Sequence, residues 1–227
     1  MAIAPTLNEN SEGYIADAQY PIAQTLLSSL QASRSREKAS IVNSALVLCA
    51  DHELNASALA ARVAASCDAS LYSSLLSAVG TFSGSLHGLA SRRTENTVSN
   101  SMKFKSTSAW LKDFLKHSER IPGFGTDLYE DGDPRAKFLI ESAQSISNKN
   151  ANLIRLLEIV DCVGEQIGAK PNLDIGLAAI TYALSLPAGS GSTLFAVSRT
   201  AGWIAHAIEQ RAYGGLIRPR ARYMGKM

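Results

Sequence analysis

The chain has 227 residues, enough for one large domain or for a large and a small one, and its 46% hydrophobic and 19% charged residues are typical of a globular protein. A net charge of +2, few aromatic residues and no basic run argue against nucleic acid or a membrane as the partner. Three scattered cysteines outside any CxxC pair predict neither disulfides nor a metal site. The sequence shows neither a secretory signal nor an apolar run of roughly 18 residues. Together with the unpaired cysteines, this indicates a cytoplasmic location.

Residues 1–20 contain Pro, Asn and Gly and are expected to be loosely structured. From Pro21 onward Ala, Leu, Ser and charged residues dominate and no strand-like alternation persists, which predicts an all-α fold. The apolar run 41–51 favours a buried helix, and Asn55 stands where an N-cap would start the next one. Further helices are expected at residues 56–66, 70–82, 110–116, 174–186 and 193–211. Two more are expected within residues 135–168, separated by a break near 147–150. In the polar stretch 91–108, apolar residues recur near helical spacing. The segment 122–134 holds several Pro and Gly residues and predicts a loop.

Two of the histidines are candidates for a site. His52 lies between two acidic residues at the junction of two predicted helices, where a structural histidine capping a helix end is the ordinary interpretation. His87 is followed by Gly88 in a turn of small residues, which lets a ligand approach the backbone. His117 is expected in solvent, and His206, on an apolar helix, is expected to be a satisfied core histidine.

Four charged residues stand in unusual surroundings. Asp174 opens a nearly uncharged helix, either as a cap that complements the helix dipole or as a general base whose proton affinity burial would raise. Arg199 lies within an apolar helix and needs an anionic partner, and Arg135 and Arg218 lie beside prolines. Three such arginines suit a substrate with two or three carboxylates, and three separate structural salt bridges explain them equally well.

Five motifs occur in the order found in citrate synthases: ADHELNAS at residues 50–57, LHG at 86–88, GFG followed by DPRA at 123–136, PNLD at 171–174 and SRTAGWIAH at 198–206. From about Asn43 to Gly225 the chain resembles that family. The resemblance implies a large helical domain of residues 1–88 and 174–227, shortened at its N-terminal end, and a small helical domain of residues 89–173. It places an active site in the cleft between them.

The resemblance also implies residue roles. His52 would hold the acceptor acid, His87 would donate to the thioester oxygen, and Asp174 would remove the methyl proton to form an enolate. Arg135 and Arg199 would clamp the carboxylates, and Arg218 would reach in from the partner subunit. Contacts to CoA are implied for Leu86, Gly123, Phe124, Gly125, Lys170 and Asn172.

The implied reaction condenses acetyl-CoA, or another short acyl-CoA, with oxaloacetate or a related 2-oxo acid. The CoA thioester is then a co-substrate, and no permanently bound cofactor is expected. A homodimer is predicted because the nearly uniformly apolar helices in residues 41–82 need covering on all sides.

The chain departs from the family pattern after the GFG turn. Thr126 takes the catalytic position at which the family has a histidine, and threonine offers one neutral hydrogen bond and no positive charge. The loss of an oxyanion donor typically costs about 10²–10³ in rate. Asp127 adds negative charge where an anion should bind. Condensation is therefore the leading prediction, with citryl-CoA lyase-like cleavage and non-catalytic binding of an acyl-CoA or dicarboxylate as alternatives.

Overall fold

The computed structural model describes residues 19–126, 128–146 and 149–225, and within these ranges all regular structure is helical, which confirms the all-α prediction. The helices are α1 (Ile22–Ser29), α2 (Arg36–Cys49), α3 (Ala56–Ser66), α4 (Leu71–Phe82), α5 (Ala90–Ser101), α6 (Thr107–Phe114), α7 (Pro134–Ile146), α8 (Ala151–Ile167), α9 (Leu173–Ala183) and α10 (Ser190–Tyr213). The loose structure predicted for residues 1–20 falls almost wholly outside the described residues. None of the described helices is long and apolar enough to cross a membrane.

Helix starts follow local side-chain chemistry. The Asn55 side chain accepts a hydrogen bond from the Ala58 amide at 3.0 Å, which confirms the predicted N-cap. The apolar run 41–51 is the later part of α2, which begins earlier because Ser35 caps it. Pro134 begins α7, at the helix position where a missing amide proton costs nothing.

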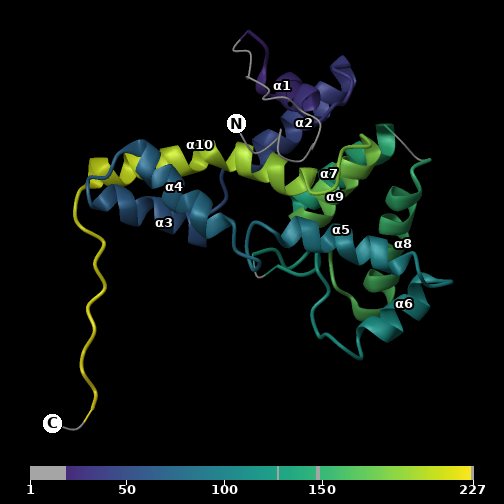
Figure 1. Cartoon of the computed structure of the whole chain (residues 1–227). Coiled ribbons are helices and arrows are strands. Elements are labelled where there is room, and N and C mark those ends of the chain that lie inside the picture. Colours follow the sequence, from purple (N-terminus) through teal and green to yellow (C-terminus); the bar gives the residue numbers. More distant parts are fainter. Residues whose placement is uncertain (1–18, 127, 147–148, 226–227) are drawn as a thin grey trace.

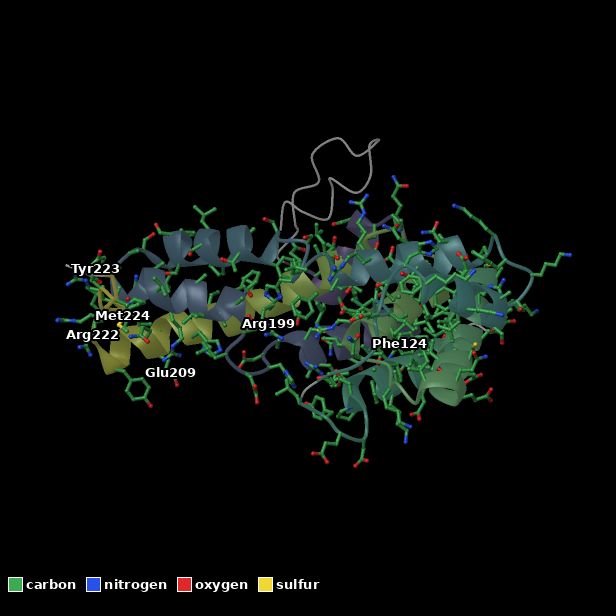
Figure 2. The ribbon with its side chains drawn as sticks, turned by 90° about the horizontal axis from the view of Figure 1, so that it is seen from below. Phe124, Arg199, Glu209, Arg222, Tyr223 and Met224 are labelled. Carbon is green, nitrogen blue, oxygen red and sulfur yellow. The ribbon has the colours of Figure 1, made fainter. Side chains whose placement is uncertain are left out.

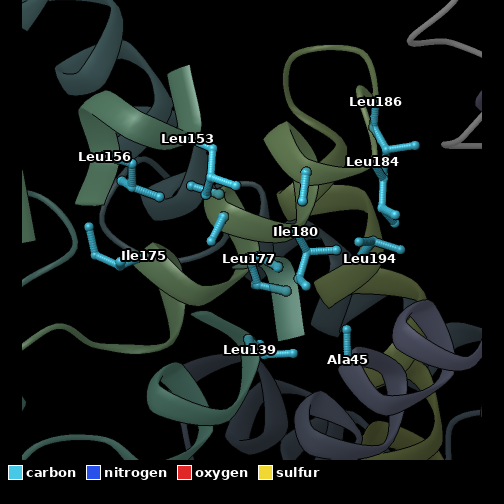
Figure 3. Close-up of a cluster of buried hydrophobic side chains, with 14 of the residues drawn as sticks. Ala45, Leu139, Leu153, Leu156, Ile175, Leu177, Ile180, Leu184, Leu186 and Leu194 are labelled. Carbon is cyan, nitrogen blue, oxygen red and sulfur yellow. The ribbon is translucent and has the colours of Figure 1, made fainter. Parts of the chain in front are cut away.

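The larger hydrophobic cluster surrounds α9, which is buried on nearly every face (Figure 3). Leu177 and Ile180 of α9 are fully buried, and Leu139 of α7 and Leu153 of α8 belong to the same cluster. Each such side chain contributes about 1.5–3 kcal/mol by leaving water. The cluster fixes the start of α9, where Asp174 lies, against the helices around it.

The smaller cluster joins α3, α4 and α10 into an elongated arm (Figure 1). Ala58, Ala61 and Ala78 are fully buried and allow the helices to approach closely. Phe82 stacks on Phe195 with ring centroids 5.4 Å apart. The arm leaves several large apolar side chains exposed: Leu59, Val63, Tyr72, Leu76 and Ile208. The predicted division into two domains stays a prediction.

The C-terminal tail leaves the far end of α10 as an extended segment (Figure 1). Figure 1 shows the tail running away from the arm, and in Figure 2, seen from below, Arg222, Tyr223 and Met224 lie on the side of the molecule remote from Arg199. Arg218 is exposed in the same tail.

The C-terminal end of α2 is bonded directly to α10. Arg199 Nε donates to the Cys49 carbonyl at 2.8 Å, the Gly202 amide donates to the Ala50 carbonyl at 3.1 Å, and the Ser198 hydroxyl donates to the Leu46 carbonyl. These contacts occupy carbonyls that a helix end leaves without intrahelical partners. They also fix the turn that begins at Ala50 and carries His52.

Gly202→Ala should destabilise the fold by about 1–3 kcal/mol. A Cβ at residue 202 would lie 2.4 Å from the Ala50 carbonyl oxygen and 2.9 Å from Asp51 Oδ1, so the two helices would have to separate. The control is Gly164→Ala in α8, where nothing lies within 4 Å and a gain of about 0.5–1 kcal/mol is expected. Urea unfolding measures both variants, and equal stabilities for them would contradict close packing at Gly202.

Candidate active site

Four of the predicted site residues line one cavity of about 320 Å³ between the α2–α3 turn, the end of α4, the loop before α7, and α10. They are His52, His87, Arg135 and Arg199. The remaining walls are formed by Glu53, Leu54, Asn55, Leu128, Leu173 and Phe195. The tertiary structure therefore gathers two imidazoles and two guanidinium groups from four separate parts of the chain.

Arg199 is the most deeply buried cation of this cavity, at 1% exposure. Its Nε is bonded to the Cys49 carbonyl, its guanidinium lies 4.9 Å from the Phe195 ring centroid, and its buried Nη1 has no hydrogen-bond partner among the described residues. A buried guanidinium nitrogen without a partner is costly, so this group favours an anionic ligand in the cavity.

Arg135 is already paired. Its Nε and Nη2 donate to the two carboxylate oxygens of Asp133 at 2.9 and 2.7 Å, and its amide donates to Oδ1 at 3.0 Å. Burial alone would raise the pKa of Asp133, but the bonds and charge of Arg135 outweigh it and leave that pKa lowered. Asp133 therefore offsets much of the charge that Arg135 presents to the cavity.

His52 bonds to a residue that the sequence analysis missed. Its Nε2 lies 2.6 Å from the Tyr129 hydroxyl, and the two rings are tilted by 40° with centroids 5.6 Å apart. Burial and then the charge of Arg135 lower the pKa of His52, so the imidazole is neutral at neutral pH. The available signal was the one aromatic residue in the acidic segment between the GFG turn and Pro134.

His87 is held by a buried hydroxyl. Its Nε2 lies 2.8 Å from Ser57 Oγ, which accepts from Trp203 Nε1 at 3.0 Å and donates to Asn55 Oδ1 at 2.8 Å. While Ser57 donates to Asn55, His87 must carry its ring proton on Nε2 to bond to Ser57. If the Ser57 hydroxyl turns and donates to His87, the imidazole carries its proton on Nδ1. Burial and then Arg199 lower the pKa of His87.

Asp174 lies in the first turn of α9, where Asn172 caps the helix and accepts from the Asp174 amide at 3.0 Å. Its carboxylate accepts from Ser91 Oγ at 2.6 Å, and Ser91 lies at the start of α5, four residues after His87. Burial raises the pKa of Asp174, with Ser91 and nearby arginines opposing the shift. A carboxylate with raised proton affinity is suited to act as a general base.

The predicted CoA contacts lie on two segments that bond to each other. The Gly125 amide donates to the Lys170 carbonyl at 2.9 Å, and the Asn172 amide donates to the Gly123 carbonyl at 2.9 Å. Phe124 and Gly125 line a second cavity of about 380 Å³. Gly123, at φ +88°, leaves no room for a side chain, since a Cβ would lie 2.7 Å from Ile175.

Asp174 is not among the residues that line the cavity of the histidines, and three further predicted site residues also lie apart from it. Thr126 lines the second cavity instead of the one with the histidines, and its hydroxyl accepts from the Leu128 amide at 3.2 Å. Arg218 is in the exposed tail, and Leu86 is 88% exposed in the α4–α5 turn. Asp127 lies outside the described residues. No cluster that could hold a metal ion occurs among the residues the structure describes.

Acidification should destabilise the chain through His52 and His87. Both have pKa values below the ordinary 6.5, so below that pH the unfolded chain binds protons that the folded chain does not. The free energy of unfolding contributed by these residues is therefore lost as the pH falls from about 7.5 to about 5.5.

Urea unfolding at several pH values measures the effect. The double variant with His52→Gln and His87→Gln should lose less stability than wild type over this interval. The carboxylates contribute to both curves, so their effect cancels in the difference between the two proteins. Parallel curves for the two proteins would contradict the prediction.

Comparisons with known proteins agree with the helical fold and the motif order. A sequence model of the citrate synthase C-terminal domain matches residues 1–220. Citrate synthase of Haloferax volcanii is 41% identical over 189 residues, which are 80% of this chain and 49% of that protein. Citrate synthase 2 of Bacillus subtilis is 35% identical over 210 residues, covering 91% and 56%. The chain thus spans about half the length of these relatives.

Solved structures show the same fold. Citrate synthase of Thermoplasma acidophilum, in complex with carboxymethyl coenzyme A and oxaloacetate, matches with a TM-score of 0.83 and 28% identity over 96% of this chain and 60% of that one. Citryl-CoA lyase of Hydrogenobacter thermophilus matches with a TM-score of 0.80 and 25% identity over 92% and 86%. The order of the motifs, the all-helical fold and these matches together show that the chain belongs to the citrate synthase family.

Proposed function

We propose that the chain condenses a short acyl-CoA, acetyl-CoA in the first instance, with oxaloacetate or a related 2-oxo acid through an enolate. Arg199 carries this proposal, because it lines a cavity shared with two imidazoles and its buried Nη1 has no hydrogen-bond partner among the described residues, which favours an anion. Arg199 binds a carboxylate of the acceptor acid, and His52 and Arg135 line its site.

Asp174 is the base of the proposed reaction. It removes a proton from the carbon next to the thioester, and its raised pKa reduces the gap between the two proton affinities. His87 stabilises the enolate oxygen by donating from Nδ1, which requires the Ser57 hydroxyl to turn from Asn55 Oδ1 and donate to His87 Nε2. Ser91 holds the carboxylate of Asp174 in place.

The nucleotide end of CoA is assigned to the second cavity. Its wall is formed by the GFG loop, which Asn172 and Lys170 hold through backbone and amide bonds. Lys170 and Leu86 are the remaining proposed contacts. This arrangement supports a CoA thioester as a co-substrate that is consumed in each turnover.

A homodimer through the arm is part of the proposal. Exposed apolar residues on α3, α4 and α10 leave a face that a second copy would cover, and the tail extends from the same arm. Arg218 of one copy would then reach the cavity of the other. The cysteines Cys49, Cys67 and Cys162 are free thiols, which supports the proposed reducing, cytoplasmic setting.

Cleavage of citryl-CoA is the second candidate. The structural match to the citryl-CoA lyase from Hydrogenobacter thermophilus, with a TM-score of 0.80, supports this candidate. The position of Thr126 outside the cavity of the histidines supports the third candidate, a binding protein without turnover.

Two incubations separate these candidates. Acetyl-CoA with oxaloacetate releases free thiol only if the chain is a synthase. Citryl-CoA gives acetyl-CoA and oxaloacetate without thiol if it is a lyase. Calorimetric binding of either ligand with no turnover in both mixtures would identify a binding protein, and the absence of binding as well would overturn the proposal.

Asp174→Asn should abolish turnover while the acceptor acid still binds. The amide keeps the size of the side chain and can accept from Ser91, but it cannot take the proton. Thiol release should fall by about 10²-fold or more, and calorimetry should give an unchanged affinity for oxaloacetate. Undiminished thiol release would exclude Asp174 as the base.

A further inference from the structure

The loop between the GFG turn and α7 contains one aromatic residue, Tyr129, which neither the motifs nor the proposed function uses. Its hydroxyl lies 2.6 Å from His52 Nε2, and the guanidinium of Arg135 lies 5.9 Å from its ring centroid. Both of these neighbours line the cavity of the histidines. The phenol oxygen is therefore bonded to one residue assigned to the acceptor acid, and the tyrosine ring lies beside a second.

Position 126 does not supply a comparable group. The Thr126 hydroxyl is bonded to the Leu128 amide and faces the second cavity, beside Phe124. Three residues further along the loop, the hydroxyl of Tyr129 lies next to His52. Among the described residues of this loop, Leu128 lines the cavity and Tyr129 is the one whose hydroxyl bonds to a histidine of the cavity wall, whereas Thr126 does not.

The proton arrangement at His52 leaves the phenol free to donate. His52 is neutral and carries one ring proton. With that proton on Nε2, His52 donates to Tyr129 Oη, and the hydroxyl proton of Tyr129 is available to a ligand. The contact with Arg135 holds the plane of the tyrosine ring.

We propose that Tyr129 is the catalytic hydrogen-bond donor to the keto oxygen of the acceptor acid, an inference that rests on the proposed condensation. As the enolate carbon bonds to the keto carbon, the π electron pair of the C=O bond moves to oxygen, and Tyr129 gives its proton to that oxygen. The proton from the acyl methyl group stays on Asp174. After the products leave, Asp174 releases this proton to water and tyrosinate takes one from water.

Tyr129→Phe tests the assignment, because it keeps the ring and its contact with Arg135 and removes the hydroxyl alone. The kcat for condensation should fall about 10²–10³-fold, with little change in KM for oxaloacetate. Exchange of the methyl protons of acetyl-CoA with deuterium, measured by NMR with malate in place of the keto acid, should continue at the wild-type rate, since Asp174 and His87 are intact.

Tyr20→Phe is the matched control. Tyr20 is exposed and contacts Arg34 before α2, so this variant should match wild type in both assays. An unchanged kcat in Tyr129→Phe would overturn the proposal. So would a raised KM with unchanged kcat, because Tyr129 would then only position His52. A wild type that neither exchanges protons nor condenses would instead reject the proposed function.

A readout without turnover keeps the two proposals separate. The infrared carbonyl stretch of bound oxaloacetate should lie at lower frequency in wild type than in Tyr129→Phe, because a hydrogen bond to the keto oxygen weakens the C=O bond. Equal frequencies in the two complexes would overturn the role of Tyr129, whether or not the protein turns over. If wild type binds no oxaloacetate, both proposals fall.

Discussion

The attachment of the α2 end to α10 is the interaction on which the rest of the cavity depends. Helix α2 ends with carbonyls that need donors, and α10 supplies them from Ser198, Arg199 and Gly202. Gly202 permits the contact because no side chain separates the two backbones. The same bonds place His52 and Arg199 at one cavity, so a helix-capping arrangement also builds the candidate active site.

The charges of the cavity are unequal in their effect. Arg135 is neutralised by Asp133 in a bidentate pair, whereas Arg199 is buried with one nitrogen unpaired. Among the described residues, Arg199 is therefore the cavity cation with an unpaired buried nitrogen, and its surroundings are neutral imidazoles, apolar side chains, Asn55 and the carboxylate of Glu53. The attraction for an anion is therefore centred on the guanidinium of Arg199, and a carboxylate bound there orients a small acid relative to the two histidines.

Ser57 links the core of the arm to the chemistry of the cavity. Its hydroxyl is fully buried and shared among Trp203, His87 and Asn55, so one proton sets the tautomer of an imidazole. Asn55 in turn caps α3. The helix start and the protonation of His87 are thus coupled, which makes the state of His87 a property of the packed arm.

The sequence by itself determined the helical class, the N-cap at Asn55, the loop with the GFG turn and the list of chemistry-bearing residues, because periodicity, capping and turn chemistry act over a few neighbouring residues. It placed Thr126 in the catalytic list and gave no role to Tyr129 or Ser57. Only the tertiary structure decided which arginine is left without a partner, which hydroxyl meets which imidazole, and that Arg218 lies away from the cavity within one chain. These facts depend on contacts between residues 30 to 150 positions apart. The packing of whole helices brings such residues together, and no local sequence pattern records it.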